Sequence, residues 1–258
     1  MLIFHSGRMR FEQFDSHGAA FFWLASKGCS CLECKEAKAE APPAAPPPPP
    51  PPPKKLKVVP VDRESALERA VFAVGDVETT GFGCGAVVIQ MALGLFDAEG
   101  KMLGMYNRLW RLPRRTHIGK DAMRVHKITY AMLKEEGRNP KEEFPVVKQL
   151  LDRLLAKGAP VVFHNSKFDT RLLRQTAEKW GVRGWSLTSE QCVCTMGQLK
   201  EPAGITSKKT GKLKAPGNAE LYRLLYGKEP DFGNLHDAAT DIRVTAAVYV
   251  KAKSFGWL

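Results

Sequence analysis

Five acidic and imidazole side chains, set in three short motifs, are the residues of this chain best suited to chemistry. Asp76 and Glu78 lie in the segment Asp-Val-Glu-Thr-Thr-Gly, Asp169 ends the segment His-Asn-Ser-Lys-Phe-Asp, and His236 and Asp241 bound the segment His-Asp-Ala-Ala-Thr-Asp. Four carboxylates in one pocket repel each other strongly unless divalent cations neutralise them. The motifs therefore indicate metal-assisted chemistry on a phosphate-containing substrate.

The carboxylates offer only hard oxygen ligands, which favour Mg²⁺ or Mn²⁺. Two such ions about 4 Å apart would clamp the attacking and leaving oxygens of an in-line displacement at phosphorus. His236 adds a group that titrates near neutral pH and can take a proton from the attacking water. Taken alone, each residue also has an ordinary interpretation as a helix cap, an exposed side chain or a core histidine. For Asp237 we prefer such an interpretation, as a helix-start residue.

The elements that must hold these residues begin with three predicted strands. Val71–Val74 is a short apolar run that delivers Asp76 at its end, and the two-residue period of a strand places Asp76 and Glu78 on one face. Ala86–Phe96 and Lys101–Leu112 have the composition of strands and are separated by a good hairpin turn. We expect these three strands to form a meander.

Helices bring the other two carboxylates to the same place. A helix beginning near Lys167 puts Asp169 at the start of its buried stripe. In a helix over Asp237–Lys253, the apolar side chains three and seven residues beyond Asp241 share its face. The four acids therefore converge at one edge of an α/β sheet. The other predicted elements are a helix ending before Gly158, strands at Val161–Phe163 and Gln191–Cys194, a helical turn at Thr195–Lys200, a loop at Glu201–Gly217 and a helix at Asn218–Tyr226.

The charge of the chain favours a polyanionic partner. The 258 residues carry a formal charge of +12 at neutral pH, and 44% of them are hydrophobic, enough for a sizeable core. After residue 57, 31 Lys and Arg face 22 Asp and Glu, so the excess lies on the folded part. A basic body around an acidic pocket suits nucleic acid, which is attracted at long range and held locally through metal ions. Solubility is the alternative explanation of the charge.

A run of Ala and Pro at residues 41–53, closing in eight consecutive prolines, divides the chain. It cannot form a helix or a sheet and predicts a stiff polyproline II spacer. We expect residues 1–40 to be disordered or to form a short helix, 41–57 to be a linker with a basic end, and 58–258 to be the catalytic domain. The proline run is also of the type that SH3 or WW domains bind.

The cysteines and the absence of long apolar runs bear on the compartment. Six cysteines in a chain of this length do not make a disulfide scaffold, so we expect a reducing, intracellular location. Cys29, Cys31 and Cys34 could bind zinc with His17, but they lack the regular ligand pairs of a structural site. For the basic run at residues 54–57 we prefer a solvated linker end, with a nuclear-import signal as the alternative. We expect no membrane insertion.

In this order and at these separations, the three motifs resemble those of the DEDDh branch of the DnaQ-like 3′→5′ exonucleases. The resemblance covers about residues 70–253, including segments at 125–129 and 215–227. It implies a ribonuclease H-like fold, with a mixed five-stranded sheet flanked by helices. It also implies release of nucleoside 5′-monophosphates from the 3′ ends of DNA or RNA, single strands foremost, with His236 as general base. The implied metal ligands are Asp76, Glu78, Asp169 and Asp241.

The resemblance also implies that Thr79 and Thr80 lie near the terminal 3′ nucleotide and that Asn165 faces the substrate. Two basic clusters could follow the phosphate backbone, one around Trp110, a candidate stacking surface, and one in the loop at residues 208–214. From the second cluster we favour Lys212 and Lys214.

Three positions depart from the family pattern. Gly75 stands where a larger strand residue is common, Lys127 replaces a common Gly, and Ser166 replaces a small apolar residue. None of them removes a catalytic group, so the resemblance implies an active enzyme.

Two other functions compete with a nuclease. One is a nucleic-acid-binding or scaffold protein that keeps the fold without turnover, against which the intact set of five residues argues. The other is a zinc phosphohydrolase that uses four histidines, although their spacing forms no ligand pair. These histidines are His117, His126, His164 and His236.

Overall fold

The computed structural model describes residues 2–5, 8–11, 63–233 and 236–258. By its internal contacts the chain divides into two units, Met1–Val58 and Val59–Leu258. In the first unit, β1 (Leu2–His5) and β2 (Arg8–Phe11) pair antiparallel, where the sequence led us to expect no strand. The proline run and the cysteines at 29, 31 and 34 lie outside the described residues.

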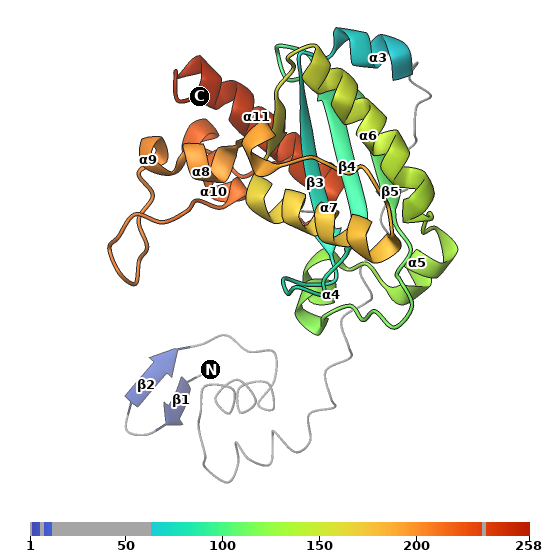
Figure 1. Ribbon diagram of the computed structural model, residues 1–258. Coiled ribbons are helices and arrows are strands. Elements are labelled where there is room, and N and C mark those ends of the chain that lie inside the picture. The colour runs from blue at the N-terminus through green and yellow to red at the C-terminus, as the bar shows by residue number, and fades with distance from the viewer. Residues whose placement is uncertain (1, 6–7, 12–62, 234–235) are drawn as a thin grey trace. The chain divides into compact units, whose positions relative to one another are not determined.

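The second unit is built on a five-stranded sheet of order β5-β4-β3-β6-β7 (Figure 1). β3 (Phe72–Thr79), β4 (Val88–Phe96) and β5 (Met102–Leu109) form the predicted antiparallel meander. β6 (Val161–Phe163) and β7 (Cys192–Cys194) add two strands parallel to β3. The sheet is therefore mixed, as predicted.

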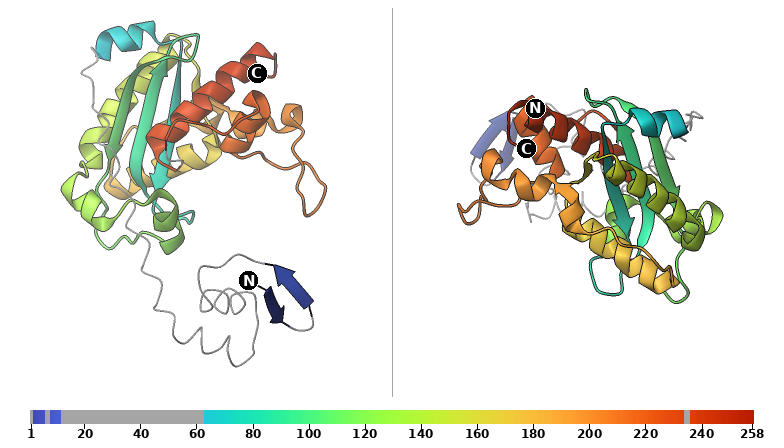
Figure 2. Two further views of the ribbon diagram at one scale, coloured as in Figure 1. Left: turned by 180° about the vertical axis from the view of Figure 1, so that it is seen from behind. Right: turned by 45° about the horizontal axis from the view of Figure 1, so that its top comes forward.

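Helices cover both faces of this sheet. α6 (Pro140–Ala156) and α7 (Ser166–Trp180) lie on one face, and α11 (Ala238–Ser254) crosses the other, which Figure 2 shows from behind. α10 (Asn218–Tyr226) packs against α11 through a third apolar cluster. The shorter helices are α3 (Arg63–Arg69), α4 (Lys120–His126), α5 (Tyr130–Glu135), α8 (Thr195–Gln198), α9 (Lys200–Ala203) and the 3₁₀ helix η1 (Ser189–Gln191).

The alternation of side chains along β3 determines which residues point to each face of the sheet. Ala73 and Val77 pack with α6 and α7 in the largest apolar cluster, whereas Phe72 and Val74 pack with α11 in the second. Asp76 and Glu78 share the parity of Phe72 and Val74, so strand geometry sends both toward the face that α11 covers.

The strand that carries these acids continues beyond the predicted end. We expected the apolar run to deliver Asp76 at the end of the strand, but β3 continues to Thr79, and Asp76 pairs with Ala92 of β4. Every residue of β4 is buried, and its pairing with β3 extends the ladder beyond the apolar part of β3. The acids therefore project from a paired strand, which fixes their backbone more firmly than a loop would.

Gly75 is explained by its neighbour across the sheet. A Cβ built on Gly75 would lie 2.4 Å from the aromatic ring of Phe163, which fills that space. The small residue at position 75 of β3 therefore makes room for the large aromatic ring of Phe163 on the neighbouring strand β6. Among the helices in the described part of the chain, none combines the length and the apolar character needed to cross a bilayer.

Candidate active site

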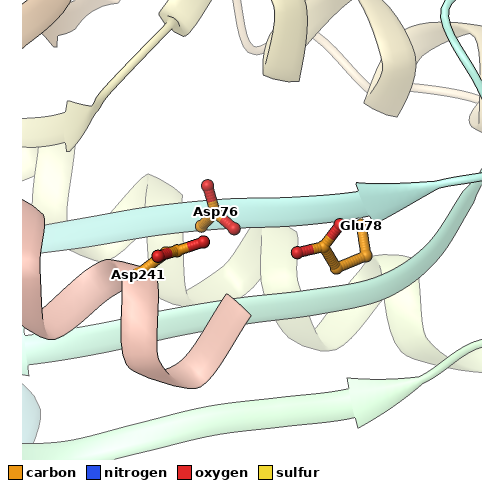
Figure 3. A group of neighbouring side chains, drawn as sticks. All are labelled: Asp76, Glu78 and Asp241. Atoms are coloured by element: carbon orange, nitrogen blue, oxygen red, sulfur yellow. The ribbon is translucent and has the colours of Figure 1, made fainter. Parts of the chain in front are cut away.

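Three carboxylates meet between the sheet and α11. One oxygen each from Asp76, Glu78 and Asp241 lies within 4.8 Å of the other two (Figure 3). Asp76 and Glu78 come from β3, and Asp241 from the first turn of α11. The packing of Ile242 against the sheet holds that turn in place. All three carboxylates are half-buried.

Asp169 joins this group from α7 and is almost fully buried, with 3% of its surface exposed. Its carboxylate accepts a hydrogen bond from the backbone N–H of Val77. β6 pairs with β3 only at Ala73 and Val74, so the later N–H groups on that side of β3 lack a strand partner. Asp169 satisfies one of them and is thereby held beside the acids of β3.

The carboxylates make the ionised form of one another less favourable. Burial, followed by repulsion from Asp169, Asp241 and Glu78, raises the pKa of Asp76 well above its ordinary value. Burial and the neighbouring acids raise the pKa of Glu78 to about 8, and burial raises that of Asp169 to about 8. For Asp241 burial raises the pKa to about 6, while the neighbouring His236 and the hydrogen bond from its backbone N–H oppose the rise.

These donors fit a divalent cation. The cluster contains only carboxylate oxygens, which suit Mg²⁺ or Mn²⁺, and it lacks the thiolates or imidazoles that select zinc. A cation in this position would also neutralise the repulsion that raises the pKa values. The residues present therefore fit the metal ions that the motifs imply.

His236 lies at the rim of the site and is exposed. Its backbone N–H donates to Oδ2 of Asp241 at 3.1 Å, and its backbone has a φ of 67°, in the left-handed region. Non-glycine residues rarely adopt the left-handed conformation, and those that do are often found at functional sites. The hydrogen bond ties the histidine loop to the carboxylate that completes the cluster.

Sequence reasoning missed a supporting residue, Gln90. This buried glutamine of β4 stands opposite Glu78 and donates to Oδ1 of Asp237 at 3.0 Å and to Oδ1 of Asn107 at 3.1 Å. Asp237 is the N-cap residue of α11, as we predicted, but its carboxylate bonds to Gln90 and makes no capping bond to the helix backbone. A polar residue inside the apolar run of β4 was the available signal.

The predicted substrate residues near the carboxylates occupy the strand and helix ends beside them. Thr79 and Thr80 are buried, and their hydroxyls bond to the carbonyl of Gly81 and to the N–H of Val87, respectively. Both therefore shape the loop that follows β3. Asn165 is the N-cap residue of α7, and its carbonyl accepts a bond from the N–H of Asp169.

The same loop carries an exposed aromatic ring that the sequence analysis did not select. Phe82 is 77% exposed, and its ring lies 5.6 Å from that of Phe168, next to Asp169. A large apolar side chain left in solvent beside a polar site is a candidate ligand contact.

The lysine loop is not brought to the carboxylates. The segment between α9 and α10 projects away from the sheet in both Figure 1 and Figure 2. Within it Lys212 is exposed, whereas Lys214 pairs with Glu220 at 2.6 Å. The stacking surface predicted at Trp110 is wrong, because this ring is fully buried against Phe144.

The four histidines of the zinc alternative do not form a cluster in the described part of the chain. His126 is buried, and its Nδ1 accepts the N–H of Ile128. Burial lowers the pKa of His164 to about 4, and its Nδ1 lies 3.0 Å from the hydroxyl of Thr195. His117 is exposed.

Solved structures share this fold. The nuclease domain of 3'hExo, a DEDDh family member bound to rAMP, is 14% identical, with a TM-score of 0.55 over 72% of this chain and 92% of that chain. E. coli Exonuclease I in complex with a dA16 oligonucleotide is 18% identical, with a TM-score of 0.55 over 71% of this chain and 40% of that chain. Cell-death related nuclease 4 (CRN-4) is 16% identical, with a TM-score of 0.53 over 72% and 64% of the two chains. The predicted ribonuclease H-like exonuclease fold is confirmed.

Comparison with curated protein sequences finds no match. The family described as Exonuclease (RNase_T) matches residues 74–249, which contain every residue of the carboxylate cluster, Asp169 and His236. With the sheet, the clustered acids and this match in agreement, the chain belongs to the exonuclease family.

Proposed function

We propose that this exonuclease works from the 3′ end of DNA or RNA and releases nucleoside 5′-monophosphates. The observation that carries the proposal is the carboxylate cluster, in which Asp76, Glu78 and Asp241 present oxygens within 4.8 Å of one another and Asp169 lies alongside. Such a set of oxygens favours two divalent ions over one strongly held zinc. Asp76, Glu78, Asp169 and Asp241 would hold Mg²⁺ or Mn²⁺.

The ions, when bound, supply charge neutralisation at the phosphate and a lowered pKa for the attacking water. The protein's own part is to place the acids on a rigid strand and two helices and to hold the scissile phosphate among them. His236 accepts the proton that the water loses as its oxygen attacks phosphorus. Its exposed position allows the imidazolium to pass that proton to solvent.

The proposed mechanism leaves a hydroxyl on the shortened strand. The bond from phosphorus to the 3′ oxygen breaks, the phosphate departs with the terminal nucleoside as a 5′-monophosphate, and the 3′ oxygen takes up a proton. The exposed ring of Phe82 offers a stacking face to an unpaired terminal base, which favours single-stranded ends. Thr79 and Thr80 precede the Phe82 loop and Asn165 caps α7, and we propose that all three contact the terminal nucleotide.

Two solved relatives support the substrate class. The 3'hExo nuclease domain binds rAMP, a nucleoside monophosphate, and E. coli Exonuclease I binds single-stranded DNA and a dA16 oligonucleotide. One fold therefore accommodates both sugars in different proteins. We propose DNA and RNA as alternative substrates here, because the site is built for phosphate and terminal sugar.

Digestion of oligonucleotides labelled at either end tests this function. In Mg²⁺ or Mn²⁺, the 5′-labelled strand should shorten by one nucleotide at a time while the 3′ label leaves as a mononucleotide, and a chelator should stop both. Asp76→Asn and His236→Ala should each reduce the rate on the order of 10³-fold. Glu99→Gln, which removes an exposed acid in the turn after β4, is the matched control.

Three results would contradict the proposal. Label loss that starts from the 5′ end would overturn the polarity, and unchanged digestion by Asp76→Asn would overturn the site. Salt-sensitive binding without product in any divalent metal would favour the scaffold alternative, in which the proline-rich linker recruits an SH3- or WW-type partner.

A further inference from the structure

A basic groove runs beside the helix that carries Asp169. It has a volume of about 540 Å³ and lies between α7 and the segment Trp185–Glu190. Lys167, Arg171 and Arg174 line it from α7, and Glu190 is the acid in its lining. The groove therefore has an excess of positive charge outside the carboxylate site.

Helical geometry gives α7 two different faces. Lys167, Arg171 and Arg174 are spaced four and three residues apart, so they form a single row on the helix surface. Asp169 is about 200° around the helix from Lys167 and turns instead toward β3. One helix thus presents a metal ligand to the site and a row of cations to the groove.

The row leads away from the catalytic centre. α7 begins at Ser166, three residues before Asp169, and Lys167 lies in its first turn. From Lys167 to Arg174 the helix rises about 10 Å, the length of roughly three stacked nucleotides. A strand that leaves the site along α7 would meet these cations in sequence.

The opposite wall of the groove is held firmly. Trp185 packs edge-on against Phe144 at 4.8 Å between ring centroids. The backbone N–H of Thr188 donates to Oε1 of Gln191 at 2.9 Å, which fixes the turn between them. A preorganised wall lets an extended ligand bind without the cost of ordering a loop.

The cations at the two ends of the row are weakly engaged within the protein. Arg174 lies 4.0 Å from Glu178, with both side chains about two-thirds exposed, and no ion pair joins Lys167 to a described residue. Arg171 is different, because it lies over the ring of Phe168 and donates to the carbonyl of Phe82. The end cations are therefore available to an external anion.

We infer that this groove binds the phosphate backbone of the substrate strand on the 5′ side of the cleaved nucleotide. The inference rests on the proposed nuclease function and adds a second contact region to it. A row of cations that starts two residues before Asp169 and is spaced along one helix face matches the repeating charges of a polynucleotide. Two or three nucleotides beyond the scissile phosphate would lie in the groove.

Binding measured without turnover tests the inference. Lys167→Gln combined with Arg174→Gln removes the two end charges and keeps the side-chain length. Lys179→Gln combined with Arg183→Gln removes the same charge from exposed positions that do not line the groove. Fluorescence anisotropy in chelator would measure the Kd for a dinucleotide and for a single strand of about twelve nucleotides at several salt concentrations.

Each phosphate contact on a single strand contributes about 0.7 to the slope of log Kd against log salt concentration. Loss of two contacts should lower the slope for the longer strand by about 1.4 and weaken its binding on the order of 20-fold at 0.1 M salt. Dinucleotide binding and the control pair should be unchanged. If the first variant is unstable, Arg174→Gln alone should give about half the change in slope.

An unchanged slope for the longer strand in the groove variant would overturn the inference, and it would leave an acidic protein partner as the occupant of the groove. Failure of the wild-type protein to release mononucleotides in Mg²⁺ or Mn²⁺ would instead overturn the proposed function. The two failures are separable, because the binding assay contains no divalent metal.

Discussion

Neutralising Glu78 should make the metal-free protein more stable while abolishing its activity. Burial and the neighbouring acids raise the pKa of this carboxyl from 4.5 to about 8 in the folded protein. The folded state therefore holds a proton that the unfolded chain releases between these pH values, so stability falls as pH rises from 4.5 to 8. Glu78→Gln removes this penalty because the amide stays neutral.

The size of the effect follows from the shift in pKa. From its ordinary pKa of 4.5 up to pH 7, about 2.5 pH units, the folded carboxyl keeps a proton that the unfolded chain releases, which corresponds to about 3.4 kcal/mol. The side chain is half-buried, so solvent reduces this figure, and we expect about 1.5 kcal/mol. For a unit of this size that is an increase in Tm of about 5 °C.

Thermal unfolding in chelator at pH 7.5 and pH 4.5 measures the prediction. The Tm of Glu78→Gln should exceed that of the wild type at the higher pH and should nearly match it at the lower pH, where the folded carboxyl is protonated and the unfolded one is about half protonated. Added Mg²⁺ should raise the Tm of the wild type and leave the variant nearly unchanged, because the metal loses a ligand. A lower Tm for the variant at pH 7.5 without metal would refute the reasoning, since it would mean that the carboxylate is stabilising.

Three further changes test the supporting structure. Gly75→Ala places a methyl group against the ring of Phe163 and should cost about 1–3 kcal/mol, measured by urea unfolding; an unchanged midpoint would mean that the ring moves freely. Lys127→Gly should raise the stability by about 1 kcal/mol in the same assay, because Lys127 caps α4 with a φ of 61°, and a loss of stability would show that its side chain matters more than its backbone. Gln90→Ala removes the hydrogen-bond donor to Asp237, which precedes α11 and follows His236. It should lower kcat on the order of tenfold and leave KM little changed, whereas an unaltered kcat would show that Gln90 does not support the site.

The sheet and the main helices were predictable because each has a strong local pattern. The runs of β4 and β6 are almost wholly apolar, and α7 and α10 are amphipathic helices bounded by Gly. The three short helices α3, α4 and α5 were missed, since six or seven residues give too few turns for a period to emerge. The predicted loop after residue 200 was also partly wrong, because α9 occupies its start.

The sequence predicted those site residues that lie in local motifs. Strand alternation places Asp76 and Glu78 together, and helical phase places Asp241 over the same face. The sequence could not reveal the bond from Gln90 to Asp237, which joins positions 147 residues apart, nor the groove beside α7, whose other wall lies in the next segment. The pairing of Lys214 with Glu220 was equally hidden, because a charge pattern does not show which cation is already neutralised.

The carboxylate cluster draws its members from the first strand of the sheet and from α11, whose Asp241 lies 165 positions after Asp76. During synthesis, β3 and its acids leave the ribosome long before the helix that completes them. Until α11 docks, the apolar face formed by Phe72, Val74 and Phe96 stays uncovered. The nascent chain therefore lacks nuclease activity until α11 supplies Asp241. The onset of activity would report the moment at which the domain finishes folding.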